Sequence, residues 1–409
     1  MILFNNLKRH KLNSVYIFII FIYAISLPIG MIKILHWENL AFIYINFFYS
    51  SMILLSLLFA YKTIKLKRIY FDLLSLFLLM LLFYGTFLGI AYKNNLSDII
   101  IDAGRIFFAL TSYLYFYNRT KSIDELKHFL KYLSKILLYV YAVIIPLAYI
   151  CNLKYGVIAY FSISSQRLLI PMIYYLKKSS LKSFISFLLI AFSGKRGVLL
   201  VALIIFIMIF ILEMLKRKNI NKLIHIFIFI SFLLVVCIII SFISPNTFDV
   251  VSNRWKSLNL FSEDFNYEIA SSGRFDEIRG VFSSMKNDNI NFFIGAGNGY
   301  SYSFVYKTKS ADYIYDNYRN VHVSIINVFM LYGGIATLIL YGIILYKLFL
   351  IKKHIKRNKL DLSDDYVIVF FILVGFFLYT FFVYELFQEA LIWIFLAVLS
   401  KTLKLKLPQ

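Results

Sequence analysis

The fold is decided by one polar stretch, which begins SPNTFDVVSNRWKSLNLFSEDFNYEIASSGRFDEIRG at residues 244–280 and continues to Val321. Nearly all of the remaining chain consists of apolar segments joined by short basic loops. A helix that crosses the hydrocarbon core of a membrane needs about 20 predominantly apolar residues. The sequence therefore predicts an all-α, polytopic membrane protein that shows one large loop to one side of the bilayer.

The bulk composition supports this class. The chain has 409 residues, of which 61% are hydrophobic and 16% are charged, whereas a soluble domain is about 45–50% apolar and about 25% charged. The net charge of +22 could indicate nucleic-acid binding. Membrane proteins, however, gather Lys and Arg in cytoplasmic loops, and no basic run here is long or interleaved with aromatic residues. We therefore expect the lipid bilayer, and no nucleic acid, as a partner.

Twelve apolar segments are candidate spans, and the positive-inside rule orders them. They cover residues 15–35, 40–61, 69–91, 97–117, 133–151, 157–176, 181–193, 197–215, 223–243, 322–350, 366–383 and 386–400. With the N-terminus inside, basic loops alternate with weakly charged ones through all twelve. This predicts cytoplasmic termini and an extracytoplasmic loop at residues 244–321.

The same pattern predicts three regions along the chain. Residues 1–176 form the N-terminal spans, residues 177–350 hold the polar loop and its flanking spans, and residues 351–409 form the last spans and a cytoplasmic tail. The richness in Ile, Asn, Lys, Tyr and Phe suggests an AT-rich coding sequence and hence a bacterium. Two cysteines fit neither a disulfide framework nor a metal site.

The polar loop contains one segment with helical periodicity. Its apolar residues recur at spacings of three and four: Phe275, Ile278, Val281, Phe282 and Met285. This spacing predicts a short amphipathic helix that lies on the membrane surface or packs over the spans. Such a helix either covers apolar surface or forms a functional lid, and the sequence favours neither.

Three positions on the predicted outer face could carry chemistry. The turn at residues 193–197 holds Lys195 and Arg196, two cations that need a partner if the turn dips into the membrane; the alternative is a snorkelling loop. Arg274 stands at the start of the amphipathic segment, unless it is a solvated loop charge. His322 opens the tenth span and is a proton acceptor near neutral pH, unless it is a hydrogen-bonded interfacial residue.

Weaker candidates for chemistry are charged residues in or near other apolar segments and in the polar loop. Asp98, Asp102 and Arg105 follow helical spacing, so that an internal ion pair is the simplest interpretation. Arg167 lies inside the sixth span and needs a partner or an anionic ligand. Arg254 lies in the polar loop. No clustered carboxylates have the character of metal ligands, so we expect neither a metal nor another cofactor.

In order and spacing, the motifs resemble those of a known family. The pattern comprises Ser-Gly-Lys-Arg-Gly at 193–197, Ser-Gly-Arg-Phe-Asp-Glu-Ile at 272–278, Phe-Ile-Gly-Ala-Gly-Asn-Gly at 293–299, His322, and Gly333-Gly334. It resembles the superfamily of O-antigen polymerases and O-antigen ligases, bacterial membrane glycosyltransferases of the C type. The motif region covers about residues 185–345. The chain departs from the family pattern at Lys195, where Ser is frequent, and at Val323, where Asn is frequent.

The resemblance implies a site and a reaction. The donor would be an undecaprenyl-diphosphate-linked glycan at the outer face of the inner membrane. Arg196 and Arg274 would hold the diphosphate, because guanidinium groups pair with phosphate oxygens bidentately. His322 would orient or deprotonate the attacking sugar hydroxyl. Lys195, Arg254, Arg167 and Arg105 would be further substrate contacts.

Three functions remain open at this point. The leading hypothesis is a polymerase that joins lipid-linked repeat units into O-antigen or capsular polysaccharide, with a chain-length regulator as a further candidate partner. The nearest alternative is a ligase that transfers polymer to lipid A-core. A flippase of lipid-linked oligosaccharide is the third, disfavoured by the absence of two similar halves.

Overall fold

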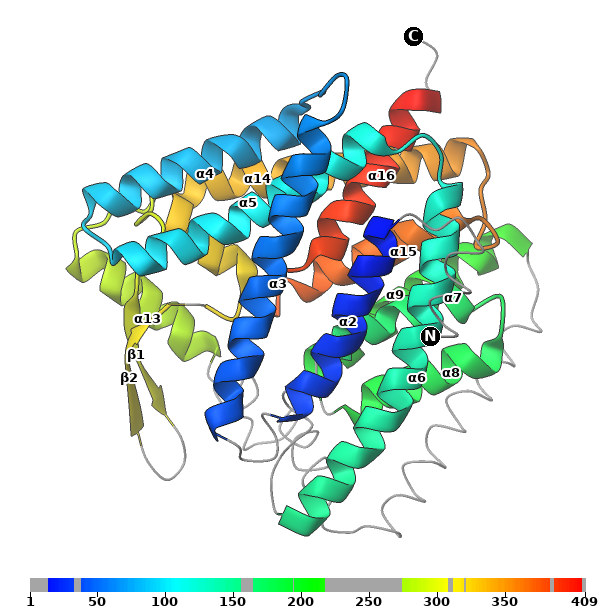
Figure 1. Cartoon of the computed structure of the whole chain (residues 1–409), viewed down its shortest axis with the longest axis horizontal. Helices are drawn as coiled ribbons and strands as arrows, with labels where there is room; N and C mark the ends of the chain where they lie inside the picture. Colours follow the sequence, from blue (N-terminus) through cyan, green and yellow to red (C-terminus); the bar gives the residue numbers. More distant parts are fainter. Residues whose placement is uncertain are drawn as a thin grey trace.

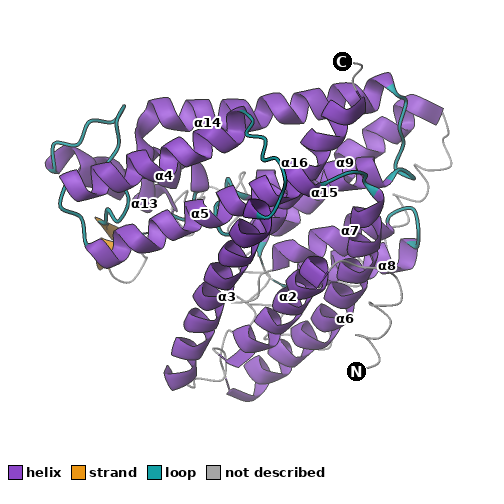
Figure 2. Ribbon diagram, turned by 45° about the horizontal axis from the view of Figure 1, so that its top comes forward, coloured by secondary structure: helices purple, strands orange, loops and turns teal. Residues whose placement is uncertain are grey.

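The computed structural model describes residues 14–32, 38–155, 165–193, 195–217, 274–307, 312–319, 321–382 and 386–406. This part of the chain is a bundle of helices with one small β-hairpin at its edge (Figures 1 and 2). The predicted ninth span at residues 223–243, the first part of the polar loop, and Arg254 lie outside the described residues. The helical fold class is therefore confirmed, while the count of twelve spans and their orientation stay predictions.

Most helices begin and end close to the predicted apolar segments. They are α2 (Ser14–Ile32), α3 (Glu38–Ile64), α4 (Leu73–Ala91), α5 (Leu96–Arg119), α6 (Asp124–Tyr155), η3 (Ser165–Leu168), α7 (Leu169–Tyr175), α8 (Ser180–Phe192), α9 (Arg196–Arg217), α13 (Arg274–Asn287), α14 (Ser324–Arg357), α15 (Asp365–Tyr379) and α16 (Ala390–Lys406).

Four described helical segments are long and apolar enough to cross a membrane. They are Leu73–Ala91, Leu96–Arg119, Leu126–Leu147 and Ser324–Arg357. Shorter apolar helices accompany them. The predicted seventh span is α8, whose 13 residues reach only about 20 Å at 1.5 Å per residue. Of the predicted sixth span, the described part is the short helix η3 followed by the seven residues of α7.

The outer faces of α4 and α14 have the surface that a lipid bilayer requires. Large apolar side chains stand exposed on α4 at spacings of three and four: Leu73, Leu76, Met80, Phe83, Phe87 and Ile90. Helix α14 exposes a comparable row, which includes Ile335, Leu338 and Phe349. Contiguous exposed apolar surface of this size marks an interaction with a membrane or a partner protein, and the length of these helices favours a membrane.

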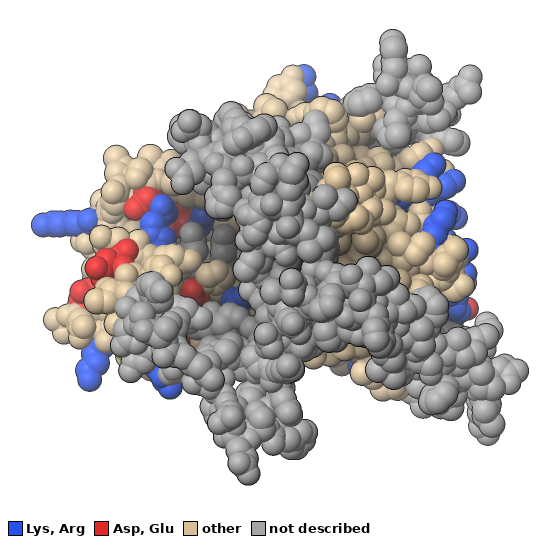
Figure 3. Space-filling model, turned by 90° about the horizontal axis from the view of Figure 1, so that it is seen from below, with Lys and Arg blue, Asp and Glu red and all other residues tan. Residues whose placement is uncertain are grey.

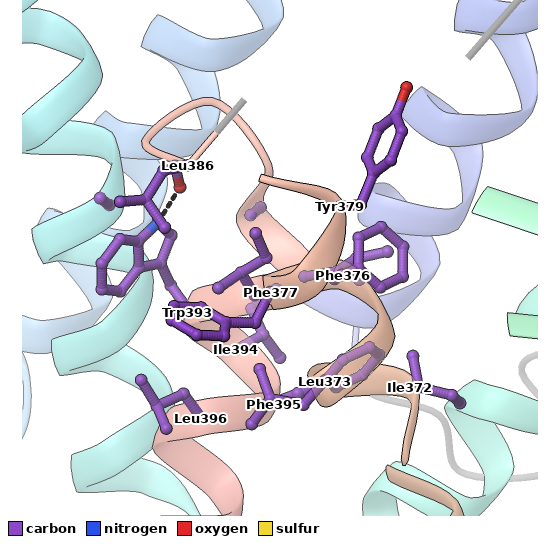
Figure 4. Packing of buried hydrophobic residues seen from close by; sticks show 14 of the residues in the cluster. Ile372, Leu373, Phe376, Phe377, Tyr379, Leu386, Trp393, Ile394, Phe395 and Leu396 are labelled. Atoms are coloured by element: carbon purple, nitrogen blue, oxygen red, sulfur yellow. Dashed lines mark hydrogen bonds between the residues drawn. The ribbon is translucent and has the colours of Figure 1, made fainter. Parts of the chain in front are cut away.

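The core of the bundle is built around α15 and α16. Nearly every position of α15 is buried, and residues 390–399 of α16 are buried without interruption. A helix that is apolar all round belongs in the interior of a bundle. Trp393 is fully buried and donates its indole N–H to the carbonyl oxygen of Leu386 at 2.9 Å (Figure 4). Tyr379, at the end of α15, points away from this cluster (Figure 4).

The polar loop folds into α13 and a hairpin of two antiparallel strands, β1 (Tyr302–Lys307) and β2 (Asp312–Tyr318). Strand β1 packs against α13, and both lie in the same half of the molecule as α4 and α5 in the view of Figure 1. Short amphipathic helices alone were predicted here, so the hairpin is a correction. Its cause is the alternation of aromatic and β-branched residues in both strands, a pattern that favours β-structure.

Candidate active site

Helix α13 begins at Arg274, where the sequence predicted its start. Asp276 and Glu277 occupy its first turn, where negative charge is stabilised by the positive end of the helix dipole. Val281 and Met285 are buried beneath the helix, whereas Phe275 and Phe282 are exposed. The helix thus packs mainly against β1 and carries its charged first turn toward the beginning of α14.

Glu277 connects α13 to the segment that opens α14. Its Oε1 lies 2.5 Å from Nδ1 of His322, and its Oε2 accepts the backbone N–H of His322 at 3.2 Å. Glu277 is 5% exposed, whereas His322 is half-buried. We assign the ring proton of neutral His322 to Nδ1, because a carboxylate can only accept. The lone pair of the imidazole is then on Nε2, as a proton acceptor requires.

Arg274 is half-buried close to this pair. Burial lowers the pKa of its guanidinium, while the charge of Glu277 and the hydroxyls of Tyr379 and Tyr318 oppose that shift. An arginine remains charged at neutral pH all the same. Its Nη1 is fully buried and donates to no acceptor among the described residues. A buried donor without an acceptor is costly, and the Nε of Arg319 is a second such donor. Arg274 differs from Arg319 in that it forms no ion pair with a described carboxylate.

The end of α15 brings the three predicted motifs to one place. The Thr380 carbonyl oxygen accepts the backbone N–H of Ser324 at 3.0 Å, two residues beyond His322. Tyr379 acts on Arg274 electrostatically. A Cβ on Gly197 would lie 3.1 Å from the Cβ of Phe382. Residues 379–382, which we call the α15 end turn, therefore lie beside all three motifs.

The structure describes the start of α9 in part. Helix α9 begins at Arg196, and Lys195 immediately before it is half-buried. The side chain of Arg196 lies outside the described residues. What is established is that the backbone at residues 196–197 lies beside the α15 end turn. The predicted contact of Arg196 with a diphosphate stays a prediction.

The glycine-rich turn at residues 295–299 has a structural role. The N–H groups of Ala296 and Gly297 donate to the carbonyl oxygens of Met330 and Leu331 at 2.9 and 2.8 Å. Helix α14 kinks at Gly333, whose φ is +78°, and the N–H of Gly334 donates outside the helix, to the carbonyl oxygen of Phe292 at 2.8 Å. The turn thereby clamps α14 at the kink, eleven residues beyond His322.

Arg105 belongs to a separate cluster of ion pairs. Its Nη1 lies 2.9 Å from Asp102, and its Nη2 lies 3.0 Å from the hydroxyl of Tyr49. Arg319 pairs with Asp98 and lies 3.6 Å from Asp102. The Asp102–Arg105 pair was predicted from spacing, and the structure adds Arg319, which ties the exit of the hairpin to α5.

Arg167 forms an ion pair with a carboxylate inside the bundle. Its Nε lies 3.6 Å from Oε2 of Glu389, and its guanidinium lies 4.2 Å from the centre of the Tyr23 ring. Tyr23 also donates a hydrogen bond to Glu389. The sequence required a partner or an anionic ligand for this arginine, and the structure provides a carboxylate 222 positions away in the chain.

Several site residues were missed by sequence reasoning. Glu277 and Tyr318 contact the same histidine, and Tyr302 has a buried hydroxyl without a hydrogen-bond partner among the described residues. The available signal for Glu277 was its place in the first helical turn beside Arg274. The signal for the tyrosines was strand alternation in residues 302–318. Among the described residues, no three of His, Cys, Asp and Glu gather as a metal site would require.

Charged groups are exposed together on the side of the molecule that carries α13 and the hairpin. The space-filling view from below shows acidic and basic atoms close to one another there (Figure 3).

The chain was compared with families of known proteins, with curated proteins and with solved structures. Residues 181–341 match a family model described as O-antigen ligase, which confirms the resemblance over that segment. No curated protein and no solved structure matches the chain.

Proposed function

From the O-antigen ligase match over residues 181–341, we propose that this protein is a polysaccharide polymerase that joins polyprenyl-diphosphate-linked repeat units at the outer face of the inner membrane. The observation that carries the proposal is the buried, unpaired N–H of Arg274 beside the Glu277–His322 pair. A cation for a diphosphate and a base for a hydroxyl stand next to each other. Both would assist the transfer of a glycan from a diphosphate to an alcohol.

Arg274 would hold the diphosphate of the donor. A guanidinium offers parallel N–H groups that match two phosphate oxygens, and such charge-assisted bonds are stronger than neutral ones. Its partly buried position strengthens the attraction, because the local dielectric is lower than that of water. Arg196 and Lys195 at the start of α9 would add positive charge near the same end turn. This charge would stabilise the diphosphate as it leaves.

His322 would act as the general base. The acceptor sugar hydroxyl attacks the anomeric carbon of the donor glycan, a new C–O bond forms, and the bond from that carbon to the diphosphate oxygen breaks. The hydroxyl proton passes to Nε2 of His322, and the bonding electrons leave with the polyprenyl diphosphate. Glu277 keeps the ring oriented and stabilises the imidazolium that forms, the role that a carboxylate has beside other catalytic histidines.

The ligase is the second candidate, because the matched family model is described as O-antigen ligase. The donor chemistry would be identical, and only the acceptor would differ: lipid A-core in place of another lipid-linked unit. The same cation and base would serve either acceptor, so the geometry of Arg274 and His322 does not separate the two.

A deletion strain separates the polymerase from the ligase. Surface glycan from the strain is resolved on gels, with the wild-type gene restored as the control. A single repeat unit on the lipid core supports the polymerase. Bare core together with accumulated lipid-linked polymer supports the ligase. An unchanged ladder of chain lengths contradicts both, and the membrane glycosyltransferase proposal with them.

A further inference from the structure

The β-hairpin presents a row of aromatic rings that ends at His322. Tyr302 and Phe304 of β1 stack at a centroid separation of 5.8 Å, and Phe304 stacks on Tyr315 of β2 at 5.0 Å. Tyr318 contacts Phe304 and Tyr302 edge-on, at 5.4 and 5.8 Å. Tyr318 in turn lies nearly parallel to the His322 ring, at 6.3 Å and 20°. The row of rings therefore runs from β1 through β2 to His322.

The two strands differ in how deeply they bury their rings. Tyr302 and Phe304 are buried against α13, where a Cβ on Gly280 would lie 2.4 Å from the Cβ of Phe304. Tyr315 is 40% exposed, and Tyr318 is half-buried. The Tyr315 ring is within 12° of parallel to Phe304, which covers one of its faces. Its exposed area therefore leaves aromatic surface open beside the row.

A second observation lies at the inner end of the row. Tyr302 is 2% exposed, yet its hydroxyl has no hydrogen-bond partner among the described residues. Burial raises its pKa, and the neighbouring Glu277 and Tyr318 raise it further. The hydroxyl is therefore a buried donor that no other described residue of the hairpin or of α13 satisfies. A tyrosine buried only to fill a hairpin core normally has a partner for its hydroxyl.

A sugar ring has the chemistry that this surface would recognise. A pyranose presents C–H groups on one face and hydroxyls around its rim, so it can stack its apolar face on a flat aromatic ring and donate or accept hydrogen bonds at the edge. Stacking of this kind gains dispersion energy and buries apolar surface. Ligand sites commonly combine aromatic walls with a few placed polar groups.

We propose that Tyr315 and Tyr318 form a stacking subsite for a sugar ring of the acceptor glycan, with the Tyr302 hydroxyl as a hydrogen-bonding group at its inner end. This rests on the proposed function, because it takes the acceptor to be the chain whose hydroxyl reaches His322. A sugar held there would be presented to Nε2 of His322 by the hairpin. The hairpin would then select acceptors by the shape of one sugar ring.

The test measures binding of a free oligosaccharide to the full-length protein in detergent. The probe is the oligosaccharide repeat unit that mild acid releases from the lipid fraction of the native host, so that it carries no diphosphate. Binding is followed by saturation-transfer NMR. Tyr315→Ala should weaken binding about 3- to 10-fold, on the scale of aromatic pair energies. Tyr315→Phe keeps the ring and should stay within about twofold of wild type.

Two further variants guard against damage to the hairpin. Tyr315→Leu keeps apolar contact with Phe304 without a flat face, and it should weaken binding as Tyr315→Ala does. Ile314→Ala removes a side chain that is 71% exposed at the adjacent position of β2, where successive side chains point to opposite faces, and it should bind normally. The subsite is wrong if wild-type protein fails to bind the probe, or if Ile314→Ala loses as much binding as the Tyr315 variants.

The outcomes also separate the subsite from the proposed function. Probe binding that depends on Tyr315, in a protein whose deletion leaves the polysaccharide ladder unchanged, would retain the subsite and reject the glycosyl transfer. A lost ladder on deletion, together with normal probe binding by Tyr315→Ala and Tyr315→Leu, would retain the transfer and reject the subsite.

Discussion

Two clusters of charge lie near the hairpin, and they are built differently. In the first, Arg105 and Arg319 are paired with Asp98 and Asp102, and the backbone N–H of Gly299 donates to Asp102 at 2.9 Å. In the second, Glu277 holds His322, and Arg274 forms no ion pair with a described carboxylate. The arginines of the first cluster are thus paired with carboxylates of the protein itself, whereas Arg274 is not. We assign a structural role to the first cluster and propose a ligand-binding role for Arg274.

The largest effect is expected from removal of the base. His322→Ala should lower turnover by about 10²- to 10⁴-fold, the usual contribution of general acid–base catalysis. Binding of the lipid-linked donor should remain, because Arg274 is untouched. Turnover is measured with purified lipid-linked repeat units, and donor binding by native mass spectrometry. Equal losses of both would show that His322 is structural.

Arg274→Ala should lower turnover by about 10²- to 10³-fold, as removal of a group that stabilises developing negative charge does. Arg274→Lys should recover little, because an ammonium lacks the bidentate geometry. Arg279→Ala is the matched control, since that side chain lies on the same helix and is 72% exposed. A normal polysaccharide ladder in cells that carry Arg274→Ala would remove this arginine from the mechanism.

Glu277→Gln should have a smaller effect. The amide can still accept from Nδ1 of His322 but cannot stabilise an imidazolium by charge, so we expect about a tenfold loss of turnover, roughly 1.4 kcal/mol of transition-state energy. The loss should appear in kcat, with KM for the donor unchanged. If KM rises instead while kcat holds, the carboxylate serves substrate binding.

The smallest effect on turnover is expected in the first cluster. Arg105→Met should leave turnover per folded molecule unchanged, while it removes a partner from the buried Asp102 and destabilises the protein by about 3–5 kcal/mol. The melting temperature in detergent measures the stability. A loss of turnover in protein that melts normally would reassign Arg105 to substrate binding and erase the contrast between the clusters.

Features set by neighbouring residues could be predicted from the sequence, whereas contacts between distant residues could not. The start of α13 and the Asp102–Arg105 pair each depend on neighbours in the sequence, and each was predicted. The Glu277–His322 and Arg167–Glu389 pairs join residues 45 and 222 positions apart, and periodicity carries no information on such pairing. The hairpin had a local signal, strand alternation at 302–318, but the helical spacing at residues 275–285 before it favoured helices throughout the polar loop.

The central claim is that Arg274, unlike Arg105, is positioned to bind a diphosphate. The most direct test compares binding of undecaprenyl diphosphate to wild type, Arg274→Ala and Arg105→Met by native mass spectrometry. One charge-assisted hydrogen bond contributes about 1.5–3 kcal/mol, so Arg274→Ala should bind about 10- to 100-fold more weakly, with Arg105→Met at the wild-type level. Equal affinity of all three proteins would contradict the account.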